Sequence, residues 1–176
     1  MALESLGDEK KNRVLKLLSK DTLQAIQKAE EDRWLPLAAN LEFVSCAMTE
    51  LGEAELFQLA LKSFTFSVNS LMVGPFFRTA INLFKIKPSA VFKLSPQIWK
   101  AIHRNCGELT VVEKEKRTVQ ILLSNLPSEM ASSRSYLIGI AGCLQAVLGL
   151  SDVEGKAVLE KRSEKDHSAA YLLSWK

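Results

Sequence analysis

Apolar residues recur at helical spacing through roughly the first 107 residues of the chain. In the clearest stretch they are separated by 4, 3, 4 and 3 positions, from Leu37 to Leu51, with Gly52 next. This spacing is typical of an amphipathic helix that ends at a glycine. Comparable stripes predict further helices at Val14–Leu18, after an N-cap at Asp21, over residues 53–66, from Gly74-Pro75, and from Ser95-Pro96 to about Gly107.

From residue 108 the apolar spacing changes from helical to alternating. It predicts strands at Glu108–Glu113, Arg117–Ser124, Lys156–Lys161 and His167–Trp175, with one helix between the two hairpins, capped by Ser132 or Ser133. The expected fold class is therefore α+β: a helical N-terminal half followed by β-β-α-β-β, forming a four-stranded antiparallel sheet covered by helices. We expect one domain over 1–176, with 1–12 loosely docked or disordered, 13–107 helical, and 108–176 forming the β-β-α-β-β half.

Composition narrows the class of protein. The 176 residues are 47% hydrophobic and 24% charged, with a net charge of +3, which is typical of a soluble globular protein. The basic excess is small and spread out, and most basic residues lie beside acidic ones, so we expect no nucleic-acid surface. The N-terminus is polar, and no uncharged apolar run reaches the roughly 18 residues of a membrane span. The three cysteines lie far apart and predict no disulfide framework. We place the protein in the cytoplasm.

Catalytic and metal-binding motifs are missing from the sequence. It contains no glycine-rich phosphate loop, no GxSxG, no HExxH and no cysteine pair at zinc-ligand spacing. We therefore predict a protein that is not an enzyme and that holds no cofactor or metal. The two histidines leave alternatives open. His103, near a helix C-terminus, suits either a haem or metal ligand or a boundary residue that interacts with the helix dipole, and the second is commoner. His167 opens the last strand.

A group of aromatic residues is the candidate ligand site. An apolar cavity for a lipid or other small molecule could be lined by Phe64, Phe66, Phe76, Phe77, Phe84 and Phe92, together with Leu144. Arg78 and Lys85 could meet a carboxylate or phosphate head group. The alternatives are ordinary core packing for the aromatic rings and a solvated face for the arginine.

The C-terminal half resembles a known superfamily. The similar segments are residues 99–109 around Asn105-Cys106-Gly107, 119–127 (VQILLSNLP), 136–144 (YLIGIAGCL) and 170–175 (AYLLSW). They resemble the superfamily shared by the vinyl-reductase-like (4VR) small-molecule-binding domains, the TRAPP vesicle-tethering subunits and the haem nitric-oxide/oxygen-binding domains. The earlier Trp34-Leu35-Pro36 and Leu51-Gly52 look like an uncharacterised paralogous branch known from myxobacteria and related bacteria.

The resemblance implies a cavity or groove between the helices and the sheet. It also implies a non-catalytic module in bacterial signalling that senses a small molecule, such as an apolar or acyl one, or docks a protein. Two alternatives are a structural protein acting as a homodimer and a haem-based gas sensor using His103. The chain departs from the family in two places: the haem-binding Tyr-x-Ser-x-Arg motif is replaced by SSRSY at 132–136, and no metal-binding cysteine follows Cys143.

Overall fold

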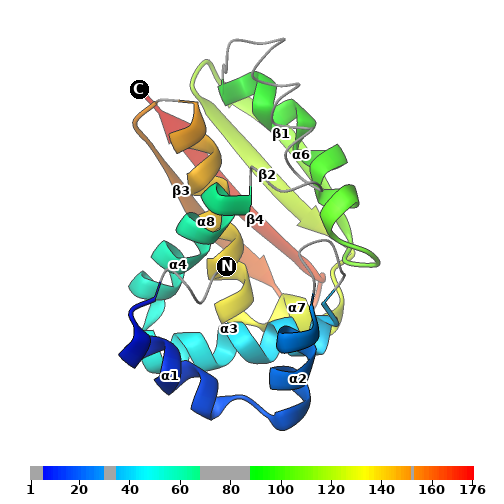
Figure 1. The fold of residues 1–176 in the computed structure, drawn as a ribbon. Coiled ribbons are helices and arrows are strands. Elements are labelled where there is room, and N and C mark those ends of the chain that lie inside the picture. Colours follow the sequence, from blue (N-terminus) through cyan, green and yellow to red (C-terminus); the bar gives the residue numbers. More distant parts are fainter. Residues whose placement is uncertain (1–5, 30–34, 68–87, 152) are drawn as a thin grey trace.

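The structure is a computed structural model, described here for residues 6–29, 35–67, 88–151 and 153–176. Figure 1 shows the order of the elements. The helices are α1 (Asp8–Leu17), α2 (Lys20–Lys28), α3 (Leu37–Leu51), α4 (Glu53–Ser67), α6 (Pro88–Ile102), α7 (Ser128–Ser132) and α8 (Arg134–Leu150). The strands are β1 (Glu108–Glu115), β2 (Thr118–Ser124), β3 (Gly155–Ser163) and β4 (Ser168–Trp175). The helix predicted from Gly74-Pro75 lies outside the described residues.

The four strands form one antiparallel sheet in the order β1-β2-β4-β3. Each hairpin pairs locally, and β2 pairs with β4 through the centre, where Ile121 lies opposite Tyr171. The expectation of an α+β fold, with a helical half followed by a four-stranded antiparallel sheet, is confirmed. Alternation carried this prediction, because every second residue of a half-buried strand faces the core.

Helices α6 and α8 lie across the same face of the sheet (Figure 1), and the main core lies between them and the strands. Val119, Ile121 and Leu123 of β2 are buried there at 0–2% exposure. Tyr171 of β4 is also fully buried, and its hydroxyl donates a hydrogen bond to the Leu137 carbonyl of α8 at 3.1 Å. A buried hydroxyl without a partner would be costly, so this bond fixes α8 against the sheet.

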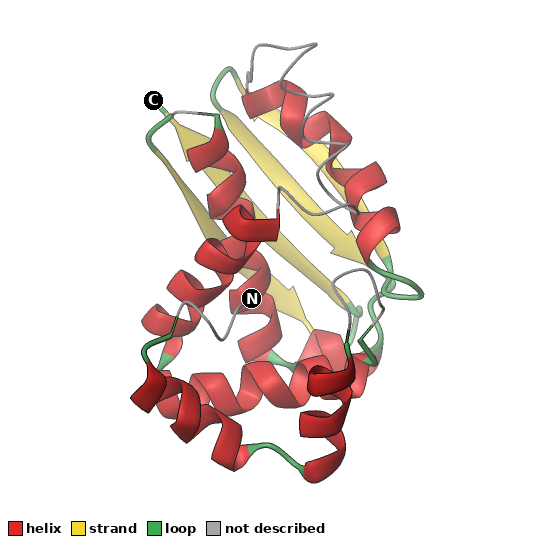
Figure 2. Ribbon diagram, viewed as in Figure 1, coloured by secondary structure: helices red, strands yellow, loops and turns green. Residues whose placement is uncertain are grey.

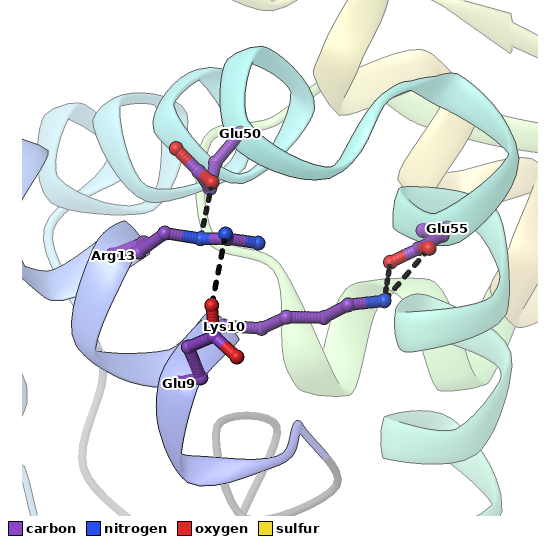
Figure 3. A network of polar contacts seen from close by, with 5 residues as sticks. All are labelled: Glu9, Lys10, Arg13, Glu50 and Glu55. Carbon is purple, nitrogen blue, oxygen red and sulfur yellow. Dashed lines mark hydrogen bonds and ion pairs between the residues drawn. The ribbon is translucent and has the colours of Figure 1, made fainter.

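Helices α1, α2 and α3 gather beyond one end of the sheet (Figure 2), and α4 packs along α8 (Figure 1). Helix α1 begins at Asp8, inside the segment 1–12 that was expected to be loosely docked. Figure 3 shows its ion pairs: Lys10 pairs with Glu55 at 2.6 Å, and Arg13 pairs with Glu9 at 3.3 Å and with Glu50 at 2.6 Å. Val14 adds a fully buried side chain. Within residues 1–12, Lys10 therefore contacts α4, whereas Glu9 pairs inside α1.

Two helix starts differ from the sequence prediction. The N-cap of α2 is Ser19, whose hydroxyl accepts from the Thr22 amide at 3.2 Å, so Asp21 lies in the first turn instead. Helix α6 begins at Pro88 and continues through Pro96, so Ser95-Pro96 is not a start. The buried residues of α6 span both sides of Pro96, from Val91 to Trp99, and their burial outweighs the hydrogen bond that a proline inside a helix loses. Ser133 caps α8, as predicted, by accepting from the Tyr136 amide.

Candidate functional site

A cavity of about 270 Å³ lies where α3, α4, α6 and α8 meet the first strand. Its walls are almost entirely apolar, and the described residues that line it include no Lys, Arg, Asp or Glu. Pockets of roughly 300–1,000 Å³ with apolar walls and a few polar groups are typical small-molecule sites. The cavity is therefore slightly smaller than that range, and its walls favour a ligand or part of a ligand that is mostly uncharged.

Two glycines of α8 shape one wall of this cavity. A Cβ built on Gly142 would collide with the Phe57 carbonyl and would lie 3.0 Å from the Cβ of Ala60, so α4 and α8 cross at backbone contact there. Gly139, one turn earlier, lines the cavity, and a Cβ built on it would meet no atom within 4 Å. The first glycine brings the two helices together, and the second leaves empty space beside their crossing point.

His103 follows the last residue of α6, and its backbone amide donates to the Trp99 carbonyl at 2.8 Å, as in a continuing helix. Its side chain lines the cavity. Burial lowers the pKa of His103 from 6.5 to about 4, and the nearby Trp99 carbonyl offsets this slightly. The imidazole is therefore neutral at physiological pH. Its Nδ1 is buried and forms no hydrogen bond of normal geometry with any described residue.

Trp99 lies one helical turn before His103 and covers its ring. The two ring centroids are 3.8 Å apart with an interplanar angle of 20°, which is a stacked arrangement. The indole is buried, and its Nε1 donates to the Gly107 carbonyl at 3.2 Å. The imidazole is thus held between a fixed indole and the cavity.

The other ionisable groups on the cavity wall come from α8. Burial raises the pKa of Tyr136 well above its usual value, and it raises the pKa of the Cys143 thiol to about 12. Both groups are neutral at physiological pH, so neither is a nucleophile in this state. Among the described residues, no group of three His, Cys, Asp or Glu side chains comes together at metal-binding distance.

The predicted site residues fall into several groups. Phe64 and Leu144 both line the cavity, together with His103. Phe66 is exposed and Phe92 is buried in the main core, so these two predictions were wrong. Phe76, Phe77, Arg78, Phe84 and Lys85 lie outside the described residues. His167 is remote from the cavity: its Nδ1 lies 2.9 Å from the Leu126 carbonyl, where it joins the last hairpin to the loop after β2.

Sequence reasoning missed Trp99, Tyr136, Gly139 and Cys143 as wall residues. The sequence pattern of α8 could have revealed its wall residues, because Tyr136, Gly139, Cys143 and Leu144 follow helical spacing along one face. A glycine within such an apolar stripe has no side chain, so it can leave empty space on the buried face of the helix. On α6, starting the helix at Ser95 hid its first buried turn, and with it the continuous face that ends at Trp99 and His103.

The fold is similar to that of solved H-NOX domains. The structure of the Fe(II) unliganded H-NOX protein from K. algicida is 11% identical, with a TM-score of 0.68, and the match covers 99% of this chain and 92% of that chain. An oxygen-binding H-NOX domain related to soluble guanylate cyclases is 10% identical, with a TM-score of 0.60 and coverage of 99% and 91%. A mutant of the T. Tengcongensis H-NOX is 13% identical, with a TM-score of 0.59 and coverage of 99% and 93%.

At this level of identity the likeness shows an H-NOX-like fold. This is the fold expected from the haem nitric-oxide/oxygen-binding part of the resemblance drawn from the sequence. No protein-family model matches the chain, and no curated protein matches it. Within the described ranges, no helix has the length and apolar character needed to cross a bilayer.

Proposed function

We propose that this chain is a sensor domain that binds its ligand in the cavity, against the imidazole of His103. The His103 imidazole, a neutral ring that lines an almost entirely apolar cavity, carries the proposal. A neutral imidazole can accept a hydrogen bond from a ligand or coordinate a metal ion through a ring nitrogen. The neutral Tyr136 and Cys143 on the same wall support binding rather than catalysis.

Haem is the first candidate ligand. A neutral imidazole is the usual protein ligand of haem iron, and His103 provides one in an apolar cavity of an H-NOX-like fold. His103 would hold haem iron through its imidazole, and Trp99 would support that imidazole from its other side. When bound, haem would supply an iron centre for a diatomic gas.

The described walls lack a partner for the charged propionates at the edge of the haem. Among the described wall residues, none provides a cation for the propionates, and Arg134 of the SSRSY segment instead pairs with Glu53 at 2.9 Å.

A smaller, neutral and mostly apolar molecule is the second candidate. The cavity volume of about 270 Å³ and the uncharged character of its described walls favour this class. Such a ligand would use His103 as a hydrogen-bond partner, and Asn40, Ser95 and Tyr136 provide further polar groups on the same walls. The same walls supply part of the room that an acyl chain would need.

Haemin titration of the purified protein separates the two candidates. Haem held by His103 gives a Soret band that is lost in His103→Phe and kept in His167→Phe, the matched control outside the cavity. If no band forms, 2-naphthol and naphthalene serve as neutral probes that differ by one hydroxyl, with their fluorescence as the readout. Binding of the probes, lost in a variant that fills the cavity, supports the second candidate. If neither haemin nor either probe binds, the sensor proposal is wrong.

The docking and homodimer hypotheses remain predictions. Among the described residues, the large apolar side chains with the greatest exposure are Leu17, Phe66 and Val158, at 48%, 59% and 53%, and they lie on α1, α4 and β3. Light scattering tests the homodimer directly, and a strict monomer at high concentration would contradict it.

A further inference from the structure

Trp99 stacks on His103 and restricts the orientation of its imidazole. The two residues are four positions apart at the end of α6, so they share a helix face. At a centroid separation of 3.8 Å and an angle of 20°, the indole covers one side of the imidazole. Rotation of the imidazole about its side-chain bonds toward the indole is blocked, and the ring is left facing the cavity that it lines.

The indole is itself fixed from the loop that leads into β1. Its Nε1 donates to the Gly107 carbonyl. Gly107 has a φ of +76° and lies against the end of β2, where an added Cβ would come within 2.9 Å of the Asn125 carbonyl carbon and would collide with the Ser124 carbonyl. A residue with a side chain would not fit this position without moving β2. The acceptor of the indole bond is therefore held by the sheet.

We propose that Trp99 is a positioning residue for the ligand site: it holds the His103 imidazole in the orientation in which its ring presents a hydrogen-bonding nitrogen to the ligand. This inference rests on the proposed binding at His103. A buried tryptophan can affect ligand affinity in two ways. If Trp99 only packs the core, it should raise the affinity for every ligand equally. If it positions the imidazole, it should raise mainly the affinity for ligands that form a hydrogen bond with His103.

Paired probes distinguish these roles. The measured quantity is the ratio of the Kd for naphthalene to the Kd for 2-naphthol, since the two probes differ by the hydroxyl that His103 can accept. In wild type the hydroxyl should improve affinity by about 2- to 10-fold, the value of one net hydrogen bond. His103→Phe sets the ratio without the imidazole. Trp99→Leu should move the ratio most of the way to that of His103→Phe.

Two further variants control for lost packing and for the single indole bond. Trp99→Phe keeps a ring on the imidazole and loses the bond to Gly107, so its ratio should lie between wild type and Trp99→Leu. Trp175→Leu removes a different partly buried tryptophan, which packs near Phe92 and not on His103, and should leave the ratio unchanged. If Trp99→Leu weakens both probes equally and keeps the wild-type ratio, the positioning role is wrong.

A second measurement needs no ligand. Titration of the His103 ring by NMR should give a pKa near 4 in wild type and in Trp175→Leu, and a value closer to 6.5 in Trp99→Leu, because removing the indole admits water to the ring. The other described ionisable groups on the cavity wall, Tyr136 and Cys143, stay neutral throughout this range. An unchanged His103 pKa in a folded Trp99→Leu variant would overturn the inference. Failure of haemin and of both probes to bind wild type would overturn the proposed function, and the NMR titration would still decide whether Trp99 controls the imidazole.

Discussion

Gly139 offers the sharpest test of the cavity, because a side chain can be added there without moving the backbone. It lies on α8, is buried, lines the cavity, and has open space where a Cβ would stand. Replacing a helical glycine with a good helix former is worth about 0.5–1 kcal/mol. Burying a leucine side chain adds about 1.5–3 kcal/mol. Gly139→Leu should therefore raise the free energy of unfolding by about 2–4 kcal/mol and leave less room for a ligand.

Gly149 is the matched control. It lies on the same helix, also has open space at its Cβ position, and is exposed. Gly149→Leu should gain only the helix-propensity part, at most about 1 kcal/mol. The assay is urea unfolding of both variants, followed by probe binding. Gly139→Leu should bind 2-naphthol at least about tenfold more weakly than wild type, the equivalent of about 1.4 kcal/mol, and Gly149→Leu should bind it normally. The cavity is refuted as the binding site if Gly139→Leu binds the probe like wild type.

Three further predictions concern the surroundings of the site. Gly142→Ala should lower the unfolding free energy by about 1–2 kcal/mol, because the added methyl collides with the Phe57 carbonyl and overpacking outweighs the gain in helix propensity; a rise would contradict the close crossing. Wild type should lose up to about 3 kcal/mol between pH 6.5 and 4, because the unfolded chain takes up a proton at His103 that the fold excludes, and His103→Phe should lack this part of the loss in urea unfolding at each pH. Hydrogen bonds from Thr22 and Ser19 lower the pKa of Glu42, so this carboxylate stabilises the fold above pH 4.5 and the contribution is lost as the pH falls below that value; Glu42→Gln should speed amide exchange in α2 and leave β2 unchanged.

The sheet half of the fold could be predicted because its signals are local. Alternation in β2 and β4 places every second residue on the covered face, and the structure buries those residues, as with Ile121 and Leu173. The serine that caps α8 could also be predicted, because its hydroxyl accepts a hydrogen bond from an amide only three residues ahead. Where a signal and its effect are a few residues apart, pattern alone was sufficient.

The errors arose where distant packing outweighs a local signal. Ser95-Pro96 has the local features of a helix start, yet both residues lie inside α6 because Val91 and Phe92 are buried against the sheet. Asp21 looked like an N-cap, but Ser19 takes that position while its hydroxyl also donates to Glu42 on α3, 23 residues later. Contacts between helices decide both cases, and a single sequence does not reveal which helices meet.

His103 shows how far the environment of one residue can change its interpretation. As a histidine near a helix end, it was more readily explained as a boundary residue than as a ligand, because a helix C-terminus favours a protonated imidazole in water. In the fold the stacked Trp99 and the cavity around it withdraw the ring from water, so the neutral form is favoured and Nδ1 has no hydrogen-bond partner among the described residues. Burial thus reverses the electrostatic argument and turns the residue into the polar anchor of an apolar cavity. That change depends on α8, whose first residue is 31 positions further along the chain, since Gly139 leaves the space that His103 helps to line.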